Sequence, residues 1–220
     1  MFYDARTNDH GLPHDPVKAI IAPRPIGWIT TMKENGKVNL APFSQFNLMG
    51  FEPAYVMFSA NTHPPRFDPK NSILNAERTG EFVYNMATWD SRVDVVRSSR
   101  LMDPEIDDLE ALGLAAAPGR AIRTPHLASA PVALECRYHG TWTLPGNTPD
   151  TTHRVVVGRV VGILLRDDAL TADGKLDVPR IKPLARLGYL DYSAVDQVFE
   201  VSLPDEEVSE GTRRKMAGGA

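Results

Sequence analysis

Short runs of β-branched, aromatic and other apolar residues dominate the hydrophobic pattern of this chain. Such runs, bounded by Pro, Gly, Asn or Asp, predict β-strands. The clearest cover residues 26–32, 55–60, 82–86, 132–144, 155–165 and 197–203. Asn35-Gly36 predicts a hairpin turn into a further strand that starts near Lys37. A polar stretch, 145–150, separates the two longest runs, so we expect these two to form an antiparallel pair.

Helical spacing is confined to a few segments between these strands. Charged and apolar residues alternate at helical intervals in 89–100 and 104–112. Asp68-Pro69 predicts a helix N-cap followed by proline at the first helical position, and this helix is expected to stop near Gly80. One or two helical turns are expected within 179–187. The proline-rich residues 1–25 are predicted to be extended, and 113–130 to be a connection.

Strands therefore outnumber helices, and the helices are inserted between strands instead of alternating strictly with them. This order favours a mainly β fold, an antiparallel barrel with helical insertions, over a parallel doubly wound sheet. A length of 220 residues favours one domain, which we place at residues 1–203. Residues 204–220 are charged and then Gly- and Ala-rich, so we expect a disordered tail or an arm over a partner subunit.

The composition argues against several classes of protein. Hydrophobic residues at 42% and charged residues at 24% are ordinary for a soluble globular protein. The net charge is −4, and no Lys/Arg cluster is interleaved with aromatics, so a nucleic-acid partner is not expected. Without a signal peptide or an apolar run near the ~18 residues of a membrane span, we expect a cytoplasmic protein with no membrane partner. The single cysteine, Cys136, lies in an apolar run typical of a buried, inert thiol.

The segment 39–44, Asn-Leu-Ala-Pro-Phe-Ser, interrupts the strand pattern. Pro42 withholds an N–H group from strand pairing, and small polar residues flank an aromatic. Backbone groups freed in this way can face the polar edge of a flat ligand, with Trp28 or Phe43 as an apolar wall. A hairpin followed by an irregular sheet edge explains the same residues, and the segment alone leaves both interpretations open.

Several separated segments together match the pattern of one family. They are residues 24–31, Gly36 with 39–47, 52–59, 70–72, 80–85, 130–136, His153 with 157–160, and 184–188. In order and spacing, these segments, which span residues 24 to 192, resemble the flavin reductase-like family of the FMN-binding split-barrel superfamily. The chain departs from that family at two places. Asn71-Ser72 stands where the family usually has Asp-Thr, and Tyr189 stands where it often has a second glycine.

The resemblance implies FMN as the cofactor, and a predicted loop-to-helix junction offers partners for its phosphate. There, backbone N–H groups, the helix dipole and two cations can converge on an anion. Asp68 would compete for the N–H groups as an N-cap, and a solvated pair between Arg66 and Asp68 is the alternative. The polar and charged residues around this junction are Ser59, Asn61, Arg66, Lys70 and Ser72.

The flavin ring is expected to meet donors from 39–44, which can stabilise the charge that develops on reduction; turn capping by Asn39 and Ser44 is the alternative. Arg186 lies in a segment resembling the family's ring-proximal loop, or it forms a surface ion pair. His153, the implied catalytic residue, matches a histidine that related reductases place near the nicotinamide; a solvated loop histidine is the alternative. The implied cofactor-binding residues are Trp28, Thr30, Thr31, Asn39, Ala41, Pro42, Phe43, Ser44, Ser59, Asn61, Arg66, Lys70, Asn71, Ser72 and Arg186.

We therefore expect a homodimeric, FMN-dependent NAD(P)H:flavin oxidoreductase that passes electrons to free flavin or another small molecule. Hydride transfer needs alignment of donor and flavin rather than a catalytic triad. Because the sequence has no Gly-x-Gly-x-x-Gly motif, NADH or NADPH is expected to be a transient substrate. The histidines show no metal-ligand spacing, so no metal is expected. The alternatives are an FMN-binding electron carrier without nicotinamide turnover, and a split-barrel protein that binds haem or nothing.

Overall fold

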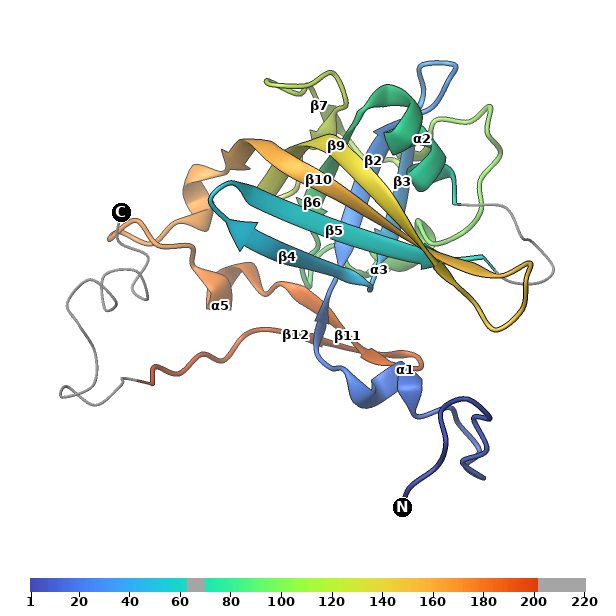
Figure 1. Cartoon of the computed structure of the whole chain (residues 1–220). Helices are drawn as coiled ribbons and strands as arrows, with labels where there is room; N and C mark the ends of the chain where they lie inside the picture. Colours follow the sequence, from blue (N-terminus) through green and yellow to red (C-terminus); the bar gives the residue numbers. More distant parts are fainter. Residues whose placement is uncertain (63–69, 202–220) are drawn as a thin grey trace.

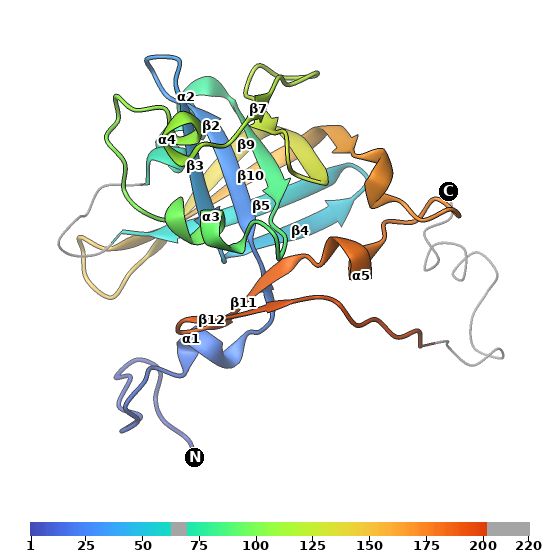
Figure 2. The same cartoon turned by 180° about the vertical axis from the view of Figure 1, so that it is seen from behind.

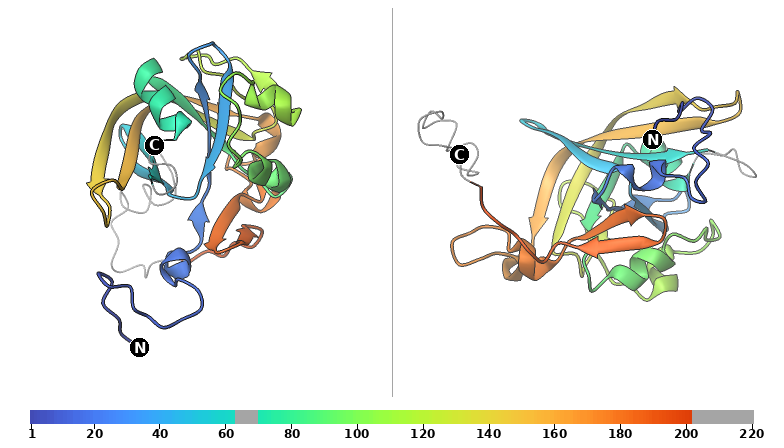
Figure 3. Two further views of the ribbon diagram at one scale, coloured as in Figure 1. Left: turned by 90° about the vertical axis from the view of Figure 1, so that its right-hand side faces the viewer. Right: turned by 90° about the horizontal axis from the view of Figure 1, so that it is seen from below.

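The computed structural model describes residues 1–62 and 70–201 of the chain. Its main feature is a seven-stranded antiparallel sheet with strand order β3-β2-β6-β9-β10-β5-β4 (Figure 1). The sheet curls over so that β4, β5, β10 and β9 form one wall of a barrel and β6, β2 and β3 the other (Figure 3, left). The strands are β2 (Gly27–Met32), β3 (Val38–Phe43), β4 (Phe46–Phe51), β5 (Ala54–Asn61), β6 (Glu81–Met86), β9 (Val132–Pro145) and β10 (Thr152–Leu165). This confirms the predicted mainly β, antiparallel fold.

Apolar side chains from both walls fill the barrel. The Phe58 ring lies 4.8 Å from the Phe43 ring and 5.2 Å from the Phe82 ring, measured between centroids. This close packing requires glycine at position 158, because a Cβ atom there would lie 2.4 Å from the Phe82 ring. Helix α2 (Asn71–Thr79) covers one end of the barrel and buries Ile73 in the same cluster. The barrel is therefore a packed core and not a channel.

A second apolar core lies on the opposite face of β2 and β3. Trp28 and Leu40 point into it, together with Val95 of α3 (Arg92–Arg97) and Leu109 of α4 (Asp108–Leu112). Figure 2 shows α3 and α4 over this back face of the sheet. The connection that follows α4 contains a two-stranded sheet of β7 (Ala116–Ala117) and β8 (His126–Leu127). The two faces of β2 thus serve different cores.

A small three-stranded sheet lies below the barrel (Figures 1 and 3). It consists of β1 (Arg24–Pro25), β11 (Leu184–Gly188) and β12 (Asp191–Ala194). Helix α1 (Val17–Ile20) packs against β11, and a Cβ atom added to Gly188 would lie 2.6 Å from the carbonyl oxygen of Lys18. The 3₁₀-helix η1 (Asp167–Ala169) and helix α5 (Val178–Ile181) connect the barrel to this sheet.

Most of the predicted strands are present, and the errors concern segments with long-range partners. Residues 26–32, 55–60, 82–86, 132–144 and 155–165 correspond to β2, β5, β6, β9 and β10. Helix α2 ends before Gly80, whose φ of 73° is left-handed as expected of a glycine cap. The predicted cap, Asp68, lies outside the described residues, and α2 begins at Asn71.

Several other predictions were wrong. The helical turn expected within 179–187 is present as α5 (Val178–Ile181), but the strand β11 that follows it, which pairs with β1, was not predicted. The described part of 197–203 contains no strand, and α3 and α4 are shorter than the predicted helices. Strands β4 and β12 were not predicted. The tail 204–220 lies outside the described residues, so the domain boundary stays a prediction.

Two further findings concern membrane-spanning helices and the single cysteine. Within residues 1–62 and 70–201, no helix combines the length and the apolarity needed to cross a membrane. Cys136 is a free, buried thiol, as predicted, and its burial raises its pKa far above the usual value, which makes it a poor nucleophile.

Candidate functional site

The outward face of β5 and β10 brings three of the predicted site residues together. In the antiparallel register, Asn61 lies opposite His153 and Ser59 lies opposite Val155. Side chains alternate along a strand, and Phe58 points into the barrel core, so its neighbour Ser59 points outward. Asn61 is two residues after Ser59 on β5, and His153 lies opposite Asn61 on β10, so both point to that same outward face. We call this set, Ser59, Asn61 and His153, the outward polar cluster.

The outward polar cluster has donors that can bind an anion. Ser59 is 8% exposed, Asn61 is exposed, and neither side chain hydrogen-bonds to another described residue. β5 ends on the side of the molecule where α2 begins (Figure 1), and Lys70, the N-cap residue of α2, is exposed. An ammonium group and a helix N-terminus at the edge of a row of polar donors favour a phosphate group. Arg66, predicted for the same role, lies outside the described residues.

The chain after β3 passes beside this cluster. The backbone N–H of Ser59 donates to the carbonyl of Gln45 at 2.8 Å, which places Ser44 and Gln45 next to β5. Ala41, Pro42 and Ser44 are half-buried. The expected interruption at Pro42 does not occur, since β3 continues to Phe43 and pairs Pro42 with Trp28. Proline is tolerated there because β3 is an edge strand of the seven-stranded sheet.

Other predicted cofactor residues form hydrogen bonds between α2 and the strands β2 and β3. The Asn39 amide donates to the Ser72 hydroxyl at 2.8 Å, and the Asn75 amide donates to the Thr31 hydroxyl at 3.1 Å. All four side chains are buried. Each buried donor has an acceptor, so these contacts anchor α2 to β2 and β3. Asn71, the first residue of α2, is half-buried. Thr31, Asn39 and Ser72 were predicted to contact the cofactor, and in the structure their side chains take part in these contacts between α2 and the sheet.

Trp28 and Thr30 point away from the outward polar cluster, into the second core. Trp28 is 1% exposed, and its indole N–H donates to the Ser98 hydroxyl at 2.9 Å. The Thr30 hydroxyl donates to the carbonyl of Pro125 at 2.7 Å. Phe43 is 6% exposed within the barrel core. The predicted apolar wall of Trp28 or Phe43 is therefore wrong for this structure, because both rings are buried by core residues.

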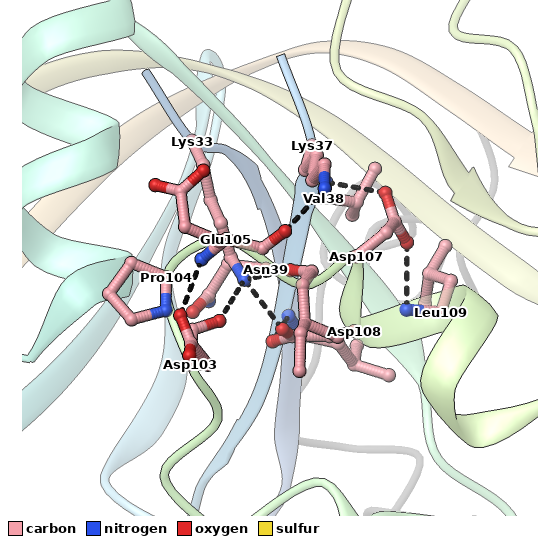
Figure 4. Close-up of polar contacts among 12 residues, drawn as sticks. Lys33, Lys37, Val38, Asn39, Asp103, Pro104, Glu105, Asp107, Asp108 and Leu109 are labelled. Carbon is pink, nitrogen blue, oxygen red and sulfur yellow. Dashed lines mark hydrogen bonds and ion pairs between the residues drawn. The ribbon is translucent and has the colours of Figure 1, made fainter. Parts of the chain in front are cut away.

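Strand β3 is held at its outer edge by two carboxylates. The Asp107 carboxylate accepts from the Val38 N–H at 2.8 Å (Figure 4). The Asp108 carboxylate accepts from the Leu40 N–H, also at 2.8 Å. Asp108 also accepts from the Lys33 ammonium at 2.7 Å in a pair whose side chains are 5% and 8% exposed. The Lys33 ammonium donates in addition to backbone carbonyls of the loop before α4. These contacts replace the missing neighbour strand and fix the segment that leads to Ser44.

Arg186 lies on β11 in the small sheet, opposite Arg24 and Tyr192. Its guanidinium carbon is 4.4 Å from the centre of the Tyr192 ring, a cation–π contact. The following turn places Tyr189 at φ 46°, the left-handed region that favours glycine, and its ring lies 5.6 Å from the His14 ring. This is the position where the resembled family often has glycine. Arg186 is thus separate from the outward polar cluster within one subunit.

The sequence assigned no role to Trp142, which the structure places next to the cluster. Trp142 on β9 lies opposite Val155 on β10, and its side chain is 53% exposed. The strand itself was predicted, but its register against β10 was not, and only the register puts Trp142 on the outward face. Among the described residues, no group of three His, Cys, Asp or Glu side chains is placed to hold a metal ion.

Comparisons with known proteins agree with this fold. Residues 21–189 match the family model described as the flavin reductase like domain. An uncharacterized protein from Halalkalibacterium halodurans is 31% identical over 84% of this chain and 87% of its own length. The solved structure of nitrilotriacetate monooxygenase component B from Bacillus cereus aligns with a TM-score of 0.83 at 21% identity, covering 91% of this chain and 98% of that one. 2-Nitrobenzoate 2-nitroreductase from Pseudomonas fluorescens aligns with a TM-score of 0.79 at 22% identity, covering 96% and 100%.

Proposed function

Since the chain belongs to the flavin reductase like domain family, we propose that it is an FMN-dependent oxidoreductase that transfers a hydride from NADH or NADPH to flavin. The observation that carries this proposal is the outward polar cluster. Ser59 and Asn61 on β5 and His153 on β10 form a row of polar side chains, and the cation Lys70 precedes α2 on the side of the molecule where β5 ends (Figure 1). Such a row fits a ligand that has an anionic end and a polar ring.

The residues of this chain have separate tasks in the proposed site. Lys70 and the first N–H groups of α2 bind the FMN phosphate, with Ser59 and Asn61 as further donors. The segment 41–45, fixed by β3 and by the Gln45 carbonyl, lies alongside the flavin ring. Bound FMN would supply the redox-active ring that accepts the hydride. His153 orients the nicotinamide donor by hydrogen bonding, and Arg66 is proposed as a second phosphate contact from sequence alone.

An absorption spectrum followed by anaerobic titration tests this function. Purified protein loaded with FMN is expected to lose its flavin absorbance near 450 nm when NADH or NADPH is added. Steady oxidation of the nicotinamide with excess free FMN should follow. Binding of FMN without reduction by either nicotinamide would instead identify an electron carrier, and protein that binds no flavin would contradict the proposal altogether.

We expect His153→Ala to slow reduction of the bound flavin or to raise the KM for NAD(P)H, with FMN affinity within about threefold of wild type. The reason is that His153 lies one strand away from the phosphate-binding donors, on β10. Stopped-flow absorbance measures the reduction step before any acceptor is involved. His139→Ala is a matched control on β9, where the centroid of the histidine ring lies 5.3 Å from that of the Tyr55 ring. A change confined to FMN binding would place His153 against the flavin instead.

We also expect a homodimer, with a mass about twice 24.3 kDa in light scattering. β4 is an edge strand of the seven-stranded sheet, at the opposite end from β3. Its apolar side chains are exposed to solvent: Leu48 by 43%, Met49 by 55% and Phe51 by 82%. Exposed apolar edge strands are normally covered by a partner. Phe51→Glu should therefore favour the monomer, whereas Leu101→Glu, an exposed position after α3, should not. A wild-type monomer at micromolar concentration would contradict this expectation.

A further inference from the structure

Trp142 stands beside the outward polar cluster. It lies directly opposite Val155, and His153 is two residues before Val155 on the same strand. Trp142 and His153 are therefore diagonal neighbours on one face, about 7–8 Å apart between Cα atoms and within reach of an aromatic side chain. Among the described residues, no aromatic ring or cation stacks on Trp142.

The other two tryptophans are accounted for by contacts in the fold. Trp28 is buried in the second core and donates to Ser98. Trp89 is 46% exposed, but the guanidinium carbon of Arg92 lies 4.1 Å from its ring centre. Trp142 is 53% exposed, and Leu144 beside it on the same face is 52% exposed. A large planar surface with an apolar neighbour thus faces solvent where polar groups converge, which is the composition of a small-molecule site.

The order of strands separates this aromatic surface from the anion-binding donors. Ser59 and Asn61 lie on β5, His153 on β10 and Trp142 on β9, in that sequence across the sheet. Neighbouring strands are about 4.8 Å apart, so β5 and β9 are separated by about 10 Å. A ring anchored through its phosphate at β5 leaves space on the β9 side for a second planar group.

We propose that Trp142 is the wall against which the nicotinamide ring of the hydride donor packs, a role that rests on the proposed function. The nicotinamide is flat and carries an amide, so its ring suits the indole face and its amide suits His153 as a hydrogen-bond partner. The FMN contacts are at β5 and α2. Trp142 therefore sets the affinity for NADH or NADPH, whereas the contacts at β5 and α2 set the affinity for FMN.

The test compares Trp142→Ala, Trp142→Phe and Trp89→Ala, each loaded with FMN. In Trp142→Ala, the dissociation constants of oxidised NAD⁺ or NADP⁺ by calorimetry, and of NADH or NADPH in stopped-flow reduction, are expected to rise about threefold to tenfold. Trp142→Phe keeps an aromatic face and should recover most of this loss. Trp89→Ala, which removes a similarly exposed indole that contacts Arg92 of α3, should match wild type. The dissociation constant of FMN, measured by flavin fluorescence, and the mass in light scattering should stay unchanged in all three.

Each other outcome overturns the proposal in a distinct way. Wild-type protein that is reduced normally, with Trp142→Ala indistinguishable from it, overturns the role of Trp142 and leaves the proposed function intact. Weaker FMN binding in Trp142→Ala places the indole against the flavin, and a lower mass places it in a subunit contact. Wild-type protein that binds FMN but neither nicotinamide overturns the reductase function and this role together.

Discussion

Asp108→Ala is expected to lower the free energy of unfolding by about 3–5 kcal/mol. The Asp108 carboxylate accepts from the Lys33 ammonium and from the Leu40 N–H, and all of these groups are buried. Removing it leaves an ammonium without its counter-charge and an edge-strand N–H without an acceptor. Because domains are stable by only about 5–15 kcal/mol, this is a large fraction of the total. Thermal unfolding followed by far-UV circular dichroism should show a fall in Tm of roughly 6–20 °C.

Two further variants separate the buried charge from other effects. Asp168→Ala removes an exposed ion pair with Arg166, whose side chains are 51% and 48% exposed, and should change stability by no more than about 1 kcal/mol. Replacing both partners, Lys33→Met with Asp108→Leu, should recover part of the loss because no uncompensated charge remains. An Asp108→Ala protein as stable as Asp168→Ala would show that the buried pair does not hold β3 in place.

Lys70→Ala is expected to weaken FMN binding by tenfold or more while leaving riboflavin affinity nearly unchanged. A charged hydrogen bond to phosphate is worth about 1.5–3 kcal/mol, which corresponds to about tenfold or more in the dissociation constant. Riboflavin has the same ring and no phosphate, so it does not use this contact. Quenching of flavin fluorescence at low salt measures both affinities, and wild-type protein should prefer FMN.

Lys175→Ala is the matched control for Lys70. Lys175 is also an exposed lysine, paired with Asp173 in the turn before α5, and should leave both affinities unchanged. Raising the salt concentration should weaken FMN binding more in wild type than in Lys70→Ala, because the exposed contact is screened. Equal affinity of the wild type for FMN and riboflavin would contradict the proposed phosphate site.

Local pattern was sufficient for the strands that carry the site. The β-rich runs 55–60, 132–144 and 155–165 predicted strands, and the polar stretch 145–150 between the last two predicted their antiparallel pairing. Glycine at position 80 marked the end of α2, since a left-handed residue is needed there. The barrel class follows from such short-range rules.

The partners of each side chain were decided only by the tertiary structure. Residues 184–187 are helix-like in composition, but β11 forms because Arg186 pairs with Arg24 from the other end of the chain. Asn39 was expected to contact a ligand, and it donates to Ser72 instead because α2 packs over it. Trp142 and His153 are diagonal neighbours only through the register of β9 against β10. Strand pairing and helix docking join residues that are distant in sequence, and their energies come from backbone hydrogen bonds and burial that no local residue pattern contains.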